Sequence, residues 1–226
     1  MPAPHPDPLT DVIGADGRRT GPFLPPGVIL AGGLARRMGG GDKGARMLAG
    51  HSLTAHVVAR LAPQVAGLAI NANGDPARFG TTGLPVLADP LPGHPGPLAG
   101  VLAAMIWAGG HGMPGVVTVA GDTPFLPRDL VARLARSWTG GIVMAASPNR
   151  AGAARDHPTV ALWPVALAAD LRVFLTQGGR RMRDWTGRHG AVRVVWPAEP
   201  VDPFFNINTP EDLAHAHAML RARADL

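Results

Sequence analysis

The chain contains no cysteine in its 226 residues, and this absence excludes every structure and reaction that depends on a thiol. Disulfide frameworks, thiolate zinc sites, iron–sulfur clusters and cysteine nucleophiles are ruled out together. A chain without thiols fits a reducing compartment, so we predict a cytoplasmic location.

Lysine is almost absent too, because 21 basic residues include a single lysine, Lys43. The formal net charge of +5 raises the question of a nucleic-acid partner. The charge is concentrated in two clusters, residues 28–46 with a net charge of +3 and residues 172–193 with a net charge of +5. A nucleic-acid face needs a long basic stripe instead. We therefore expect two small anionic ligands and no nucleic acid.

Charged residues are also missing between Pro90 and Gly121, which raises the question of a membrane span. Prolines and glycines interrupt this run, and its longest clean piece, Leu98–Trp107, is well short of the roughly 20 apolar residues that a spanning helix needs. We predict no membrane contact. Residues 1–26, rich in proline, are predicted to form a disordered extension, and residues 27–226 a single domain.

From Gly27 onward, short apolar runs typical of strands alternate with helical patterns. Helical periodicity covers residues 53–61, 130–138, 167–175 and 209–220. The strand-like runs are Val28–Ala31, Leu68–Asn71, Val86–Ala88, Val116–Ala120, Ile142–Ala146, Thr159–Leu162 and Val192–Trp196. Near-continuous apolar strands between helices predict an α/β fold of three layers, a mostly parallel sheet with helices on both faces. In such sheets ligands bind beyond the carboxyl ends of the strands.

A glycine-rich loop follows the first strand, from Leu30 to Lys43. Glycines let backbone N–H groups turn toward an anion, and the loop's cations can neutralise phosphate oxygens, so it is suited to a polyphosphate. Keeping lysine where all other cations are arginine indicates that a compact ammonium is needed. The loop fits neither a dinucleotide fingerprint, which would start directly after the strand, nor a Walker loop, because Gly44 follows the lysine.

Gly121 and then Asp122 follow the apolar run Val116–Ala120, which places one carboxylate at the end of a predicted buried strand. Mg²⁺ is usually held by one or two carboxylates together with substrate phosphates, so this position suits a magnesium ion in phosphoryl or nucleotidyl transfer. The segment Asn71–Gly74, which begins with the last residue of a predicted strand, and Asp89, after the next strand, place amide and carboxylate groups at neighbouring strand ends. The amides of Asn71 and Asn73 and the carboxylate of Asp89 suit a base or ribose. Each of these residues has a structural alternative, since aspartate and asparagine also fix turns and cap helices.

Three segments of the second half, 155–159, 178–181 and 206–210, flank predicted strands or helix starts. A structural alternative for the arginines near residue 180 is that they form a solvated helix face. A structural alternative for Asn208 or Thr209 is that it caps the last helix.

Together these segments resemble the molybdenum cofactor guanylyltransferases, within the Rossmann-like nucleotidyltransferases. The matching blocks occur in order and cover residues 27–215. They are Leu30–Gly33, Arg36–Gly39 with Asp42-Lys43, Asn71–Asn73, Gly96–Gly100, Asp122–Pro124, Arg155–Thr159 and Asn206–Pro210. The first block is shared with the wider superfamily, whereas Gly96–Gly100 and Arg155–Thr159 are similar to the guanylyl branch. Two features depart from the pattern. One is the extension before Gly27, and the other is the residue Gly121, where the family often has cysteine.

The resemblance implies transfer of GMP from Mg-GTP to molybdopterin or its molybdenum-loaded form, with release of pyrophosphate. It implies a cytoplasmic enzyme of molybdenum cofactor biosynthesis with Mg²⁺ as cofactor, and with other biosynthesis or acceptor proteins as partners. The implied catalytic residues are Lys43, Arg37 and Asp122, of which Asp122 binds the metal. The implied nucleotide contacts are Leu30, Ala31, Gly32, Gly33, Lys43, Asn71, Asp89 and Asp122. The implied acceptor contacts are Gly96, Gly100, Arg155, His157, Arg180, Arg181, Asn206 and Asn208.

Two other interpretations remain open on the residues alone. A cytidylyl- or sugar-nucleotide transferase would share the first loop and Asp122. A non-catalytic nucleotide-binding module would share the loop without the transfer reaction.

Overall fold

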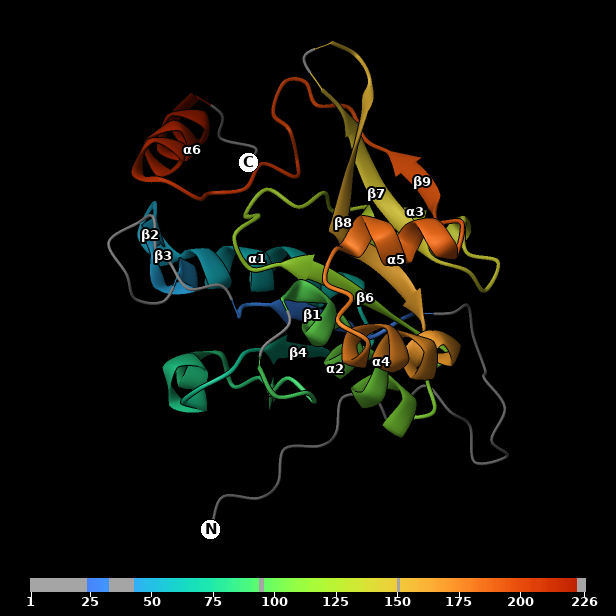
Figure 1. Ribbon diagram of the computed structural model, residues 1–226. Coiled ribbons are helices and arrows are strands. Elements are labelled where there is room, and N and C mark those ends of the chain that lie inside the picture. Colours follow the sequence, from blue (N-terminus) through green and yellow to red (C-terminus); the bar gives the residue numbers. More distant parts are fainter. Residues whose placement is uncertain (1–23, 33–42, 94–95, 150, 223–226) are drawn as a thin grey trace.

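A seven-stranded sheet forms the centre of the protein, described here from a computed structural model that covers residues 24–32, 43–93, 96–149 and 151–222 (Figure 1). The strand order is β5-β4-β1-β6-β8-β7-β9. The strands are β1 (Gly27–Leu30), β4 (Leu68–Asn71), β5 (Val86–Leu87), β6 (Gly115–Ala120), β7 (Val143–Pro148), β8 (Ala154–Pro164) and β9 (Val192–Val195). Each of the seven predicted strands is confirmed, with ends shifted by a few residues.

The sheet is mostly parallel, as predicted. Strand β1 pairs in parallel with β4 and β6, β4 with β5, and β7 with β9. Strand β8 is the exception, because it lies antiparallel between β6 and β7. Its pairing with β7 is irregular between Met144 and Ala145, where the register shifts.

Helices cover both faces of this sheet. They are α1 (Leu53–Leu61), α2 (Pro97–Gly110), α3 (Leu130–Arg136), α4 (Ala168–Thr176), α5 (Met182–Arg188) and α6 (Pro210–Ala222). One hydrophobic cluster joins α1 and α3 to one face, and a second joins α2, α4 and α5 to the other. Neighbouring strand residues alternate between them, as Ile29 packs in the first and Val28 in the second. The three-layer α/β fold is thereby confirmed.

Short elements connect these layers. Strands β2 (Met47–Leu48) and β3 (His51–Ser52) form an antiparallel hairpin before α1. Among the described residues there are also the 3₁₀ turns η3 (Lys43–Ala45), η4 (Ala62–Gln64), η5 (Pro76–Thr82) and η6 (Val165–Leu167). Figure 1 shows α6 away from the seven-stranded sheet and beside the β2–β3 hairpin. A small apolar cluster that includes Leu48, Phe125 and Ala216 joins α6 to the hairpin.

At the start of α6, Thr209 caps the helix, which is the structural alternative given for it, and Asp212 completes a capping box. The Asp212 N–H donates to Thr209 Oγ1 at 3.1 Å, and the Thr209 N–H donates to Asp212 Oδ2 at 2.9 Å. These bonds satisfy backbone groups that the first helical turn leaves without a partner. Pro210 then occupies the first helical position, where its missing N–H costs nothing.

The predicted proline-rich extension falls mainly on residues 1–23, which lie outside the described residues. Pro25 and Pro26, just before the predicted domain start, are buried, and their carbonyls accept hydrogen bonds from the Ala66 and Val117 N–H groups. Among the residues that the structure describes, no helix combines the length and apolar character needed to cross a bilayer.

Candidate functional site

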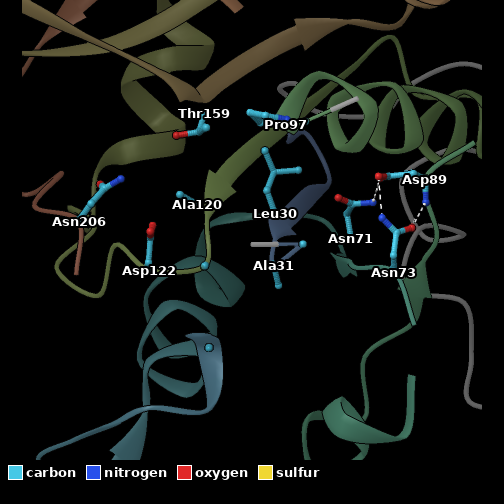
Figure 2. A pocket seen from close by; sticks show the side chains of 14 residues that line it. Leu30, Ala31, Asn71, Asn73, Asp89, Pro97, Ala120, Asp122, Thr159 and Asn206 are labelled. Carbon is cyan, nitrogen blue, oxygen red and sulfur yellow. Dashed lines mark hydrogen bonds between the residues drawn. The ribbon is translucent and has the colours of Figure 1, made fainter. Parts of the chain in front are cut away.

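A cavity of about 300 Å³ opens at the carboxyl ends of three parallel strands, β1, β4 and β6 (Figure 2). This is where the fold predicts a ligand. Asn71, Asn73 and Asp89 lie on one side of the cavity, Asp122 and Asn206 on the other, with Leu30 and Ala31 between them. The full lining is Leu30, Ala31, Gly32, Gly44, Asn71, Asn73, Asp89, Gly96, Pro97, Ala120, Gly121, Asp122, Thr159 and Asn206.

One end of the cavity is a hydrogen-bonded group of two asparagines and a carboxylate. Asn71 Nδ2 donates to Asp89 Oδ1 at 3.0 Å and to the Leu87 carbonyl at 3.0 Å. Asn73 Nδ2 donates to Asp89 Oδ2 at 2.7 Å, and Asn73 Oδ1 accepts from the Asp89 N–H. Because each amide donor is fixed by the carboxylate, the oxygens of this group are oriented before any ligand arrives. Such a set of acceptors matches the donors on the edge of a guanine.

The other end contains the predicted metal ligand. Asp122 lies immediately beyond β6 and is half-buried, and its carbonyl accepts from the Ile207 N–H at 3.0 Å. The buried Thr123 hydroxyl lies 3.5 Å from Asp122 Oδ1 and 3.4 Å from Asn206 Oδ1. A carboxylate and an amide oxygen therefore face the same end of the cavity from distant parts of the chain.

Between the two ends lies the end of β1. The Leu30 carbonyl accepts from the Gly121 N–H at 3.0 Å, and the Ala31 N–H donates to the Asn71 carbonyl at 2.8 Å. These bonds fix Leu30 and Ala31 at the cavity wall, next to Gly32.

Gly96 and Gly100, two of the implied acceptor contacts, lie at the start of α2. Gly96 lines the cavity with a φ of 87°, a conformation that glycine adopts without strain. Gly100 does not line the cavity, but a Cβ placed there would be 2.2 Å from Asn71 Oδ1 and 2.9 Å from Leu30 Cδ2. The bare backbone at this position leaves room for the Asn71 amide.

The glycine-rich loop is mostly beyond what the structure describes. Gly33 and Arg37 lie outside the described residues, and for Lys43 only the backbone, at the start of η3, is described. Gly44, the residue after this lysine, lines the cavity. The roles of Gly33, Arg37 and Lys43 remain predictions.

Arg180 and Arg181 line a second cavity, of about 400 Å³, between α4 and α5. It shares no lining residue with the first. The Arg180 guanidinium donates from Nη1 to the carbonyls of Leu175 and Gly179, at 3.0 and 2.9 Å. The prediction that this arginine pair faces the acceptor remains a prediction.

Arg155, His157 and Asn208 line neither cavity. The Asn208 N–H donates to Asp212 Oδ2 at 2.8 Å, as part of the α6 cap. Arg155 forms an ion pair with Asp202, and His157 Nε2 lies 2.7 Å from Ser147 Oγ. Burial lowers the pKa of His157 to about 4, a shift that nearby Arg155 reinforces and Asp202 opposes.

We expect His157 to make the free energy of unfolding depend on pH between about 4 and 6.5. Its pKa is about 4 in the fold and near 6.5 unfolded, so over this interval the unfolded chain binds the proton. Stability therefore decreases as pH falls, by roughly 1–2 kcal/mol after discounting for partial exposure. Urea unfolding at pH 7 and pH 4.5 should show a smaller decrease for His157→Gln than for the wild type, and equal decreases would contradict this assignment.

The oxygen donors near Asp122 fit a hard divalent cation. A carboxylate and an amide oxygen are the ligand types that Mg²⁺ accepts, and substrate phosphates usually supply further ligands. No group of three or more histidine, aspartate or glutamate side chains suited to a metal occurs within residues 24–32, 43–93, 96–149 and 151–222.

Asn73, expected near a base or ribose from its place just after a strand, completes the group around Asp89. Pro97 and Thr159 also line the cavity, although no contact was predicted for them. Thr159 lies between His157 and Ala161 of β8, where the pairing with β7 is irregular, and this irregularity cannot be read from the sequence.

Comparison with known proteins places this architecture in a family. Residues 27–193 match the family model described as MobA-like NTP transferase domain. This match begins at the first residue of β1 and includes the residues of both cavities except Asn206.

Relatives of high similarity carry one name. A molybdenum cofactor guanylyltransferase of Rhodopseudomonas palustris (strain BisB5) is 52% identical over 197 residues, covering 84% of this chain and 91% of that protein. Another, of Bradyrhizobium sp. (strain ORS 278), is 50% identical over 200 residues, covering 86% and 92%. Molybdopterin-guanine dinucleotide biosynthesis protein A of Archaeoglobus fulgidus has a similar fold, with a TM-score of 0.67 at 23% identity over 88% of this chain and 100% of that one.

Proposed function

The chain belongs to the MobA-like NTP transferases, among the molybdenum cofactor guanylyltransferases, and on this premise we propose that it transfers GMP from GTP to molybdopterin. The product is the guanine dinucleotide form of the cofactor, with pyrophosphate released. The observation that carries the proposal is the identity of about 50% to guanylyltransferases over more than four fifths of the chain.

The cavity supports the same reaction class. Acceptors oriented for a base lie at one end, around Asp89, and oxygens suited to a cation lie at the other, around Asp122. A nucleoside triphosphate placed with its base at the first end would extend its phosphates past Leu30 and Ala31 toward Asp122. We propose this orientation for GTP.

The transfer forms one bond and breaks one. A terminal phosphate oxygen of the pterin attacks the α-phosphorus of GTP, and the bond between that phosphorus and the bridging oxygen to the β-phosphate breaks. The bridging oxygen leaves with the pyrophosphate. Little covalent chemistry falls to the protein in such a step, so its contribution is alignment of two anions and stabilisation of charge.

The chain's own residues divide this work. Asn71, Asn73 and Asp89 orient the base, while Lys43 and Arg37 are proposed to hold the phosphates. Asp122 would hold the cation, for which we propose Mg²⁺. When bound, this ion offsets the negative charge on the phosphate oxygens.

For the acceptor, Asn206 and Gly96 are the proposed contacts that line the same cavity as the nucleotide. Arg180 and Arg181 are proposed to bind an anionic group of the acceptor in the second cavity. We also propose that other proteins of molybdenum cofactor biosynthesis deliver or remove the pterin. A further proposal is a cytoplasmic location, which the substrate GTP favours.

Lys43→Arg is expected to lose about tenfold or more in turnover. The variant keeps the positive charge but replaces a compact ammonium with a larger planar fork, which cannot occupy the same place among phosphate oxygens. Steady-state rates of pyrophosphate release measure the effect, with Lys43→Met as the companion variant that removes the charge. Near-normal turnover of Lys43→Arg would show that the single lysine is an accident of composition.

The function is tested by nucleotide competition. Purified protein with Mg²⁺, molybdopterin and equal concentrations of GTP and CTP should form the guanine dinucleotide, with one pyrophosphate for each product molecule. A cytidine product in equal or larger amount would favour a cytidylyltransferase. Nucleotide binding without any transfer would favour a non-catalytic module.

A further inference from the structure

Asn206 lies on a segment without regular structure, residues 196–209, which connects β9 to α6. No backbone ladder fixes this residue at the cavity. Its position must therefore come from the contacts that its neighbours in the segment make.

On its carboxyl-terminal side the segment is attached to the metal end of the cavity. Ile207 is fully buried, and its N–H donates to the Asp122 carbonyl at 3.0 Å. Asn206 is thus one residue from a backbone bond to Asp122, and this bond fixes the segment on its carboxyl-terminal side.

On its amino-terminal side the segment makes a tight turn at Asp202. Asp202 Oδ1 accepts from the Phe204 N–H at 2.9 Å, and the Asp202 carbonyl accepts from the Phe205 N–H at 3.1 Å. The other carboxylate oxygen, Oδ2, pairs with Arg155 of β8. The Asp202 side chain is 18% exposed, so its charge is largely removed from water and depends on this partner.

Phe204 anchors the segment two residues before Asn206. Its ring is almost fully buried, with its centroid 4.6 Å from that of His157 and 5.4 Å from that of Trp196. His157 is itself fixed by its 2.7 Å contact with the buried Ser147 hydroxyl. Arg155 and His157 stand two residues apart in regular pairing with β7, so both lie on the face of β8 that contacts this segment.

We propose that Arg155 and His157 are positioning residues, which hold residues 202–204 on β8 and thereby fix Asn206 at the cavity. Neither lines the cavity, and each contacts the segment that carries Asn206. The proposal rests on the proposed function, because that function defines the transfer step that Arg155 and His157 serve. It predicts that Arg155 affects transfer through Asn206 alone.

The test is a double-mutant cycle on transfer kinetics, with Arg155→Met, Asn206→Ala and the combination. We expect Asn206→Ala to lower kcat/KM for the acceptor about 100-fold and Arg155→Met about 10-fold. The double variant should be no worse than Asn206→Ala by more than about twofold, because the second change acts on a contact already lost. Losses that multiply would overturn the proposal and indicate a direct contact of Arg155 with the acceptor.

Two further variants separate positioning from general stability. Asp202→Asn keeps an oxygen for the Phe204 N–H and removes only the charge pair, so it should reproduce the loss of Arg155→Met, and the two together should not add. Arg193→Met is the matched control. Arg193 of β9 pairs with Asp156 of β8 at 2.6 and 2.9 Å, and its exposed fraction is similar to that of Arg155. Asp156 alternates with Arg155 and His157 along β8, so its pair with Arg193 lies on the other face of that strand. Arg193→Met should change transfer less than about twofold. The affinity for GTP should stay unchanged in all three variants.

Hydrogen–deuterium exchange supplies a readout that needs no activity. Arg155→Met and Asp202→Asn should speed exchange of the Phe204, Phe205 and Ile207 amides, and Arg193→Met should not. Unchanged exchange would overturn the proposal even if the wild type transfers GMP. A wild type that transfers nothing, with the expected exchange pattern, would overturn the proposed function instead.

Discussion

Asp122→Asn is expected to lower the rate of guanylyl transfer by about a thousandfold while leaving the fold intact. The change removes one negative charge from the end of the cavity where the cation is proposed, and the loss of such charge stabilisation typically costs a factor of this size. The Asp122 carbonyl, which accepts from Ile207, is unaffected because the substitution leaves the backbone in place. Pyrophosphate release at several Mg²⁺ concentrations measures the effect.

The matched control for this variant is Asp75→Asn. Asp75 is exposed, and its Oδ1 accepts from the Ala77 N–H at 2.9 Å, a bond that asparagine can also make. We expect its transfer rate to stay within about twofold of the wild type. If Asp122→Asn transfers GMP at a comparable rate with the same dependence on Mg²⁺, the metal role of Asp122 is wrong.

Gly100→Ala is expected to reduce kcat/KM for GTP about 100-fold. The new Cβ would be 2.2 Å from Asn71 Oδ1, far closer than two non-bonded atoms approach. Asn71 is 4% exposed, and its amide nitrogen is committed to the Leu87 carbonyl and to Asp89, so it can move only by breaking the group at the base end of the cavity. A displacement of about 1 Å there is enough for an effect of this size.

Gly110→Ala, in the same helix, provides the control. A Cβ at Gly110 meets nothing within 4 Å, so this variant should bind GTP normally and be as stable as the wild type or slightly more stable. Calorimetric titration with GTP separates the two glycines. Unchanged GTP affinity and turnover in Gly100→Ala would contradict the role given to Asn71.

The sequence predicted the strands well because each is a short apolar run between turn residues. Helix α2 was missed as a helix. All its residues from Leu98 to Met105 are buried, so it has no polar face and shows no helical period. The hairpin of β2 and β3 was missed because strands of two residues carry no alternation.

The candidate site could be predicted where its residues lie at the end of a strand or within two residues after it. Asn71, Asp89 and Asp122 were found in this way, and all three line the cavity. The contacts of Arg155 and His157 could not be predicted, because their partners Asp202 and Phe204 are more than 45 residues further along the chain, in a segment without periodic structure. Charge clustering predicted two anionic ligands, but it could not show that Arg180 and Arg181 line a cavity between α4 and α5.

A crystal structure with Mg²⁺ and a GTP analogue that cannot be cleaved between the α- and β-phosphates tests the central claim most directly. The account predicts the guanine against Asn71 and Asp89, the phosphates beside Leu30 and Ala31, and the ion on Asp122. A nucleotide bound in the reverse orientation, or in the cavity of Arg180 and Arg181 with the first cavity empty, would contradict it.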